Sequence, residues 1–154
     1  TDTVSVFDKI NFQYPDGAHD AEAILLDGIT KDIYIITKRD AKSKIYKLSY
    51  PQSTSSVSAA VEAGELSING ITAAALSPDG TEILLKTYTA VYYWKRKNNE
   101  SIIAALKRDA ITSGYVTEPQ GEAICFKNDN SAFFTLSEKP FFAASVLLNM
   151  YKRK

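Results

Sequence analysis

The chain has 154 residues, of which 45% are hydrophobic and 23% are charged, a composition that suits one domain with a sizeable core. Its 18 basic residues balance 18 acidic residues, which argues against electrostatic attraction to nucleic acid or to an anionic membrane. No apolar stretch approaches the roughly 20 residues of a membrane-spanning helix, so we expect no membrane insertion.

The many aromatic and β-branched residues favour strands. A strand-like segment, residues 4–14, opens the chain. Three later segments then share one pattern, in which an apolar strand, a polar turn and a second apolar strand precede a charged end. They read "HDAEAILLDGITKDIYIITKR" (19–39), "ITAAALSPDGTEILLKTYTAVYYWKRK" (71–97) and "EPQGEAICFKNDNSAFFTLSE" (118–138).

The repeat predicts an all-β fold built from β-propeller blades. Aligning Glu22, Ala74 and Glu122 gives spacings of 52 and 48 residues, a period typical of four-stranded antiparallel blades. We place the blades at about residues 19–63, 71–117 and 119–154 of a single propeller segment. One short helical insertion is expected near residues 99–108, with Asn99 as its N-cap, although an irregular loop fits that stretch nearly as well.

The strand count leaves the third blade with three strands. The N-terminal strand, or a partner chain, would complete it. Two interpretations stay open, since three blades are too few for a ring. Two copies of the chain could pair into a six-bladed homodimer, or the missing blades could belong to a longer chain.

Two apolar features carry expectations of their own. Cys125 is the only cysteine, and its place in the run "AICF" predicts a small buried side chain. The segment "PFFAA", residues 140–144, is expected to be buried in the fold or against a partner.

The motifs DAEA, TKR, SPDG and PQGEA, in this order, resemble a little-characterised and mostly bacterial family of secreted or envelope-associated β-propellers. The resemblance covers about residues 12–139. More loosely, the chain is similar to the six-bladed propellers that include phytase-like esterases and calcium-dependent lactonases. The resemblance implies a propeller fold, an extracellular or cell-envelope location, and further N-terminal blades.

The candidate site is the mouth of the central channel, which the innermost strand of each blade lines. Glu22 and Glu122 hold the same position in the first and third repeats, and a purely structural position would be expected to stay apolar or small. With Asp20 and Gln120 beside them they predict a ligand site, or a calcium site formed by Glu22, Glu122 and Asp20. Hydrogen bonds that lock neighbouring blades together would also explain the two glutamates.

Charged residues also end the second strand of each repeat: Lys38 and Arg39, Lys86, and Glu138. They predict a polar rim of mixed sign, which would bind an anionic ligand or form ion pairs between blades. His19, the only histidine, is expected at the surface rather than as a catalytic base.

Three functional hypotheses follow. The first is a module that binds a small molecule, a glycan or a protein through Glu22, Glu122, Asp20, Gln120, Lys38 and Arg39. The second is a calcium-dependent hydrolase of the esterase, lactonase or phytase type, in which Lys38 or Arg39 steadies an anionic substrate. The third is a structural or assembly protein.

Overall fold

The computed structural model describes residues 6–139, 141 and 145–153. Of the segment 140–144, all but residue 141 lies outside the described residues, as do residues 4 and 5 of the expected N-terminal strand. The described chain is almost entirely β-structure with one short helix. None of its helices has the length and apolar character needed to cross a membrane.

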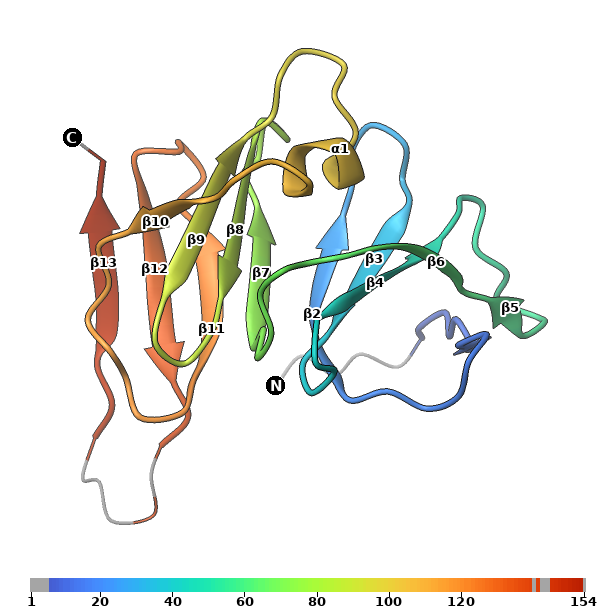
Figure 1. The fold of residues 1–154 in the computed structure, drawn as a ribbon, viewed down its shortest axis with the longest axis horizontal. Coiled ribbons are helices and arrows are strands. Elements are labelled where there is room, and N and C mark those ends of the chain that lie inside the picture. The colour runs from blue at the N-terminus through green and yellow to red at the C-terminus, as the bar shows by residue number, and fades with distance from the viewer. Residues whose placement is uncertain (1–5, 140, 142–144, 154) are drawn as a thin grey trace.

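Three antiparallel sheets follow one another along the chain (Figure 1). The first contains β2 (Ala21–Leu26), β3 (Ile33–Thr37), β4 (Lys44–Leu48) and β6 (Val61–Glu65). The second contains β7 (Ala73–Leu76), β8 (Glu82–Lys86), β9 (Val91–Lys95) and β10 (Ile111–Ser113). The third contains β11 (Gly121–Phe126), β12 (Ala132–Ser137) and β13 (Leu148–Lys152).

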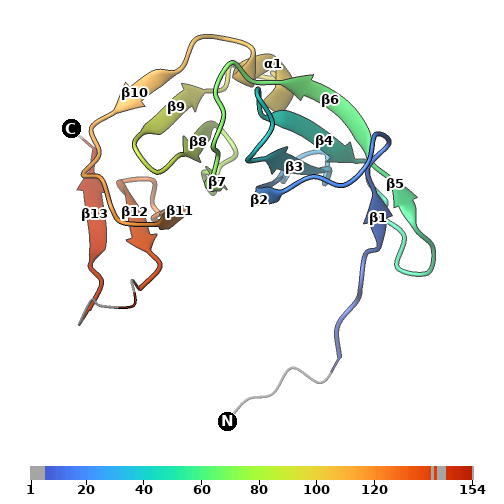
Figure 2. The same ribbon diagram turned by 60° about the horizontal axis from the view of Figure 1, so that its bottom comes forward.

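The sheets are β-propeller blades, as the sequence predicts. In each sheet the first strand in the chain lies at one edge, and the following strands add outward. Figure 2 shows the three first strands, β2, β7 and β11, together on the inner side of an arc. This radial order is the arrangement that defines a propeller.

The strand register gives the repeat a more regular period than the alignment of Glu22, Ala74 and Glu122 suggests. The last pairs before the three hairpin turns are Leu26–Ile33, Leu76–Ile83 and Phe126–Phe133. The hairpins therefore repeat every 50 residues, and the residue of the second blade equivalent to the two glutamates is Thr72. The fourth strand of the second sheet, β10, begins at Ile111 and ends at Ser113.

Two apolar interfaces hold the arc together. We call the face that a sheet turns toward the next sheet in the chain its front face, and the opposite face its rear face. The front face of the first sheet packs Ala23, Leu25 and Ile36 against Ile83 and Leu85 on the rear face of the second. A separate cluster, which includes Ala73, Leu84, Val91 and Ile124, joins the second sheet to the third.

The helical insertion is the helix α1 (Ile102–Leu106). Its N-cap is Ser101, whose hydroxyl accepts a hydrogen bond from the backbone N–H of Ala104 at 3.1 Å. The prediction that Asn99 caps the helix was wrong, because Asn99 has a φ of 59° and belongs to the turn before it. Asparagine tolerates this left-handed conformation better than most residues. Ile102, Ala105 and Leu106 of α1 extend the first interface.

The described N-terminal segment contributes β1 (Phe12–Gln13), which pairs in parallel with β5 (Ser58–Ala59) beside the first sheet. Within this chain, therefore, β1 does not complete the third sheet. The prediction that Cys125 is buried was also wrong, because its side chain is exposed. Cys125 lies on the front face of the third sheet, which no other sheet covers in the described part of the chain.

A pair of equivalent positions tests this architecture. Ile36 and Leu136 occupy the same register position in the first and third sheets, but Ile36 is 0% exposed and Leu136 is 37% exposed. We expect Ile36→Ala to lower the free energy of unfolding by about 2–5 kcal/mol. Leu136→Ala should lower it by about 1 kcal/mol or less, since less apolar surface is buried there. Urea denaturation in dilute solution measures both, and equal losses would contradict the assignment of an open front face.

Candidate functional site

The inner ends of the blades bring Glu22 and Glu122 together around one ammonium group. Nζ of Lys38 lies 2.8 Å from Oε1 of Glu22 and 3.6 Å from Oε1 of Glu122. Lys38 also donates a hydrogen bond of 2.9 Å to the hydroxyl of Tyr88, which itself donates one of 2.6 Å to Glu122. Residues of all three sheets thus meet at the channel mouth.

Lys38 is 8% exposed along its side chain, whereas each of the two glutamates is 32% exposed. Burial alone would lower the pKa of Lys38, but its hydrogen bonds to Glu22 and Tyr88 outweigh burial and raise the pKa above its ordinary value. Lys38 therefore stays charged at neutral pH. One positive charge facing two carboxylates leaves the mouth with a surplus of negative charge.

The other predicted site residues lie around this group. Asp20 forms an ion pair with Arg39 at the exposed rim, where the side chain of Arg39 is 73% exposed. Gln120 has a φ of 49°, and its carbonyl accepts a hydrogen bond from the backbone N–H of Glu138. The carbonyl of Asp20 does the same for Lys38. Asp20 and Gln120 thus hold equivalent strand ends in place.

The donor set does not fit a calcium ion. Calcium takes about six to eight oxygen ligands, but here the ammonium of Lys38 occupies the place between Glu22 and Glu122. The side chain of Asp20 turns to Arg39 instead. In the part of the chain that the structure describes, no three His, Cys, Asp or Glu side chains are grouped as metal ligands.

A cavity of about 450 Å³ opens beside the charged group. It lies between the segment that connects the first two sheets and the turn after β8. Its lining residues are Ser67, Ile68, Asn69, Gly70, Thr87, Tyr88, Thr89 and Tyr92. Tyr88 lines this cavity, and its hydroxyl also belongs to the charged group, whereas Glu22, Lys38 and Glu122 do not line the cavity. The sequence analysis missed Tyr88, which follows a strand end and carries no recognisable motif.

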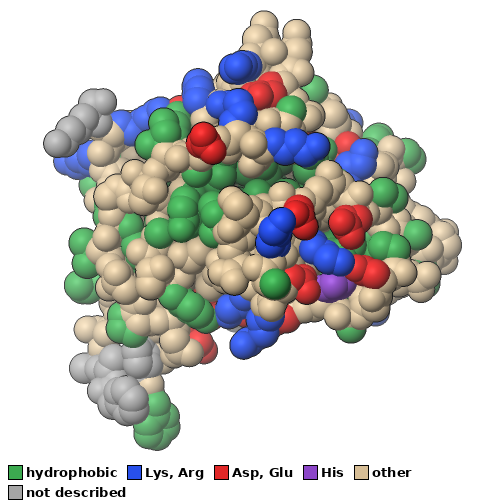
Figure 3. All heavy atoms as spheres, in the orientation of Figure 1, with side chains coloured by type: hydrophobic (Ala, Val, Ile, Leu, Met, Phe, Trp, Pro, Cys, Tyr) green, Lys and Arg blue, Asp and Glu red, His purple; other side chains and the backbone are tan. Residues whose placement is uncertain are grey.

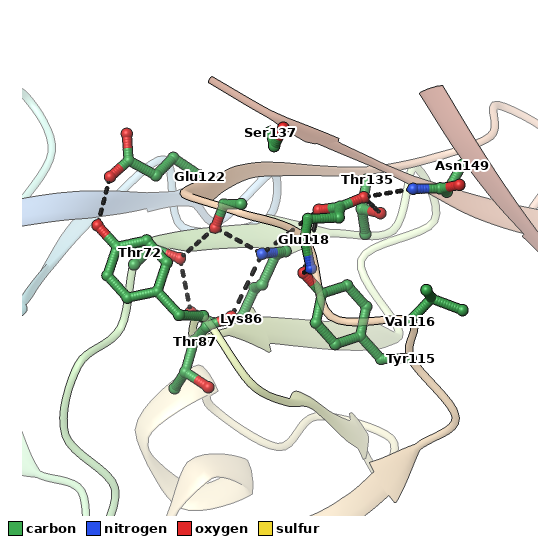
Figure 4. Close-up of polar contacts among 12 residues, drawn as sticks. Thr72, Lys86, Thr87, Tyr115, Val116, Glu118, Glu122, Thr135, Ser137 and Asn149 are labelled. Carbon is green, nitrogen blue, oxygen red and sulfur yellow. Dashed lines mark hydrogen bonds and ion pairs between the residues drawn. The ribbon is translucent and has the colours of Figure 1, made fainter. Parts of the chain in front are cut away.

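Lys86, expected at the polar rim, is instead fully buried between the second and third sheets. It takes the position held by Ile36 in the first sheet. Its Nζ donates hydrogen bonds to the carbonyls of Gly121 at 2.5 Å and Thr87 at 3.3 Å, and lies 4.7 Å from the ring centre of Tyr115 (Figure 4). Lys86 thus ties the two sheets together and is closed to ligands.

Glu118 balances this buried charge. Its carboxylate lies 3.7 Å from Nζ of Lys86 and accepts hydrogen bonds from Thr135, Asn149 and Tyr115 (Figure 4). The residue is 7% exposed, so it forms part of the core rather than the channel mouth. Together with the Lys38–Glu122 contact, this pair favours the interpretation of the strand-end charges as ion pairs between blades.

His19 belongs to a separate cluster on the first sheet. Its Nδ1 lies 3.1 Å from Asp40 and its Nε2 lies 3.0 Å from Asp16, which also accepts a hydrogen bond from Tyr46. Figure 3 shows the histidine among acidic and basic side chains. Burial and the bond to Asp16 raise the pKa of Tyr46 to about 12. None of the described contacts of His19 is with Glu22 or Glu122, and the cluster fastens the N-terminal segment to the first sheet.

The buried lysine predicts a pH dependence. Burial lowers the pKa of Lys86 in spite of the nearby carboxylate of Glu118. At pH values between this lowered pKa and the ordinary lysine pKa of about 10.4, Lys86 binds more protons in the unfolded chain than in the folded chain. The free energy of unfolding therefore rises with pH over this range. We expect the unfolding free energy of the wild type, minus that of Lys86→Met, to increase from pH 7 to about pH 10.

The matched control for this prediction is Lys95→Met, because the side chain of Lys95 is 55% exposed. The unfolding free energy of the wild type, minus that of Lys95→Met, should change little over the same pH range. Chemical denaturation at several pH values measures both differences. A difference for Lys86→Met that stays flat or falls would contradict the lowered pKa.

No family model matches the chain, and no curated protein matches it. Among solved structures, it is similar to "Crystal structure of the eukaryotic initiation factor", with 11% identity, a TM-score of 0.54, and coverage of 89% of this chain and 30% of that chain. It also matches TolB from Acinetobacter baumannii, with 17% identity and a TM-score of 0.47, over 94% of this chain and 30% of that one. The chain thus spans about a third of the length of these structures. At 11% identity, the likeness to the first of these structures bears on the fold alone. The fold of this chain is the propeller-like arrangement of β-sheets described above.

Proposed function

We propose that the chain is a binding module whose ligand site is the channel mouth at Glu22, Lys38 and Glu122. The observation that carries the proposal is that carboxylates of the first and third blades converge there on Lys38. Tyr88, which hydrogen-bonds to both Lys38 and Glu122, also lines a cavity of about 450 Å³. A few partly exposed polar groups that converge at one point are typical of a ligand site.

The ligand class follows from the free hydrogen-bonding capacity of the site. Among the described contacts, each glutamate is engaged through Oε1, which leaves Oε2 able to accept further hydrogen bonds. A ligand that fits therefore donates hydrogen bonds, as the adjacent hydroxyls of a sugar do. Tyr88 and Tyr92 add aromatic surface with polar ends to the cavity. We therefore propose a glycan ligand, which agrees with the extracellular or envelope location that we propose for the protein.

Binding of a labelled chain to a glycan array, followed by calorimetric titration of the best sugar, tests the proposal. The double variant Glu22→Gln, Glu122→Gln keeps the shape of the site but weakens its acceptors, so affinity should fall about tenfold or more, since charge-assisted hydrogen bonds are the stronger ones. The matched control is Glu65→Gln, which alters an exposed carboxylate 2.6 Å from Lys42. Array-wide absence of binding, or equal affinity in the double variant, would refute the glycan site.

Metal removal gives a second test. Because Lys38 supplies the positive charge between the glutamates, we expect sugar affinity and melting temperature to be the same in EDTA and in millimolar calcium. Lys38→Met should instead weaken binding, since two carboxylates then repel each other without a counter-charge. A calcium-dependent rise in either quantity would support the metal-dependent alternative and contradict the role given to Lys38.

A further inference from the structure

The two ends of the arc carry complementary parts of one missing blade. The third sheet has an inner strand and two following strands, β11, β12 and β13, but no outer strand within the described chain. At the other end, β1 stands where an outer strand belongs. Eight positions separate the last residue of each outer strand from the first residue of the next inner strand, namely Glu65 from Ala73 and Ser113 from Gly121. The same spacing separates the end of β1, at Gln13, from the start of β2, at Ala21.

The front face of the third sheet is apolar and open. Ala123, Leu136 and Leu148 form one cross-strand row, and Cys125, Phe134 and Met150 form the next. Leu148 is 65% exposed. In the first sheet, the residues equivalent to Ala123, Cys125, Phe134 and Leu136 are Ala23, Leu25, Tyr34 and Ile36. All four are buried, because the rear face of the second sheet covers them.

The rear face of the first sheet offers the matching surface. Ile24 and Leu26 of its inner strand are 62% and 59% exposed. Their equivalents in the second sheet, Ala74 and Leu76, pack against the front face of the first sheet. The outer half of the same rear face is already covered by the N-terminal segment through Tyr14. What stays open is the inner half, where a preceding sheet would lie.

We propose that the occupant of both open faces is a second copy of this chain. The front face of the third sheet of one copy packs on the rear face of the first sheet of its partner, and β1 of the partner adds along β13 as the outer strand. This order agrees with the rest of the arc, where each outer strand leads directly into the inner strand of the next sheet. Strand addition would also pair the open edge of β13.

A second copy fits better than a different partner because one chain carries both halves of the contact. Its two ends complement each other, yet three sheets cannot close on themselves, since propellers contain about four to eight blades. Two copies give six. A front-to-rear contact joins different surfaces, and such a contact closes into a ring when the rotation permits. The contact is independent of the glycan proposal.

Light scattering and sedimentation over a wide concentration range give the first test. We expect a species of about twice 17.0 kDa that dissociates on dilution. Leu148→Asp, which places a charge on the open front face, should raise the dimer dissociation constant about tenfold or more. The control is Ile29→Asp, a hairpin residue that is 75% exposed and lies outside both faces; its dimer should match the wild type. A wild-type mass of 17.0 kDa at every concentration would overturn the proposal.

Cross-linking distinguishes a closed pair from an open filament. Cys125 is equivalent to Leu25, and Ile24 is equivalent to Ala74; Leu25 and Ala74 lie in one packed cluster. In Ile24→Cys, a short bis-maleimide should therefore join residue 24 of one copy to Cys125 of the other, and the products should stop at the covalent dimer. The control Ile24→Cys, Cys125→Ser should give no linked product. A ladder of higher species, or equal linking in the control, would contradict the closed pair.

Discussion

The structure depends on the contact between the front face of one sheet and the rear face of the next. A sheet that is apolar on both faces is stable only when both are covered, so every blade needs a neighbour on each side. The 50-residue period of the hairpins sets up this contact, because it places equivalent residues at equal heights along β2, β7 and β11. The middle sheet is covered on both faces, whereas each outer sheet is covered on one.

In the interface between the second and third sheets, Lys86 holds the register position that the apolar Ile36 holds in the first sheet. The neighbouring sheet supplies partners for its charge. Lys86 keeps two backbone carbonyls, an aromatic ring and the carboxylate of Glu118 around its ammonium group. Gly121 leaves the necessary space, since a Cβ there would lie 2.3 Å from Nζ of Lys86. A buried ion pair adds little net stability over an apolar pair, but each partner strongly requires the other. The interface between the second and third sheets is therefore specific as well as apolar.

Much of the fold could be predicted from the sequence, because strand alternation and turn residues are local signals. The repeats around Glu22 and Glu122 indicated propeller blades, and their glutamates do meet. The alignment with Ala74 failed, because the hairpin registers place Thr72, rather than Ala74, 50 residues from each glutamate. The burial of Lys86 could not be predicted either, since a lysine at a strand end looks solvent-exposed until the neighbouring sheet is placed. Cys125 looked buried because it lies in an apolar strand, but its face of the third sheet has no neighbouring sheet to cover it in the described chain.

The channel mouth and the open faces are governed by different parts of the blades. Glu22 and Glu122 meet around Lys38 because three successive inner strands converge at one end, and this convergence is complete within a single arc. The open apolar faces extend outward from those strands and take no part in the ion pairs. A second copy would thus enclose the channel without supplying Glu22, Lys38 or Glu122 to the site of the first. The proposed ligand contacts and ring closure would therefore be separable: a substitution at Leu148 would act on association, whereas one at Glu122 would act on the proposed ligand site.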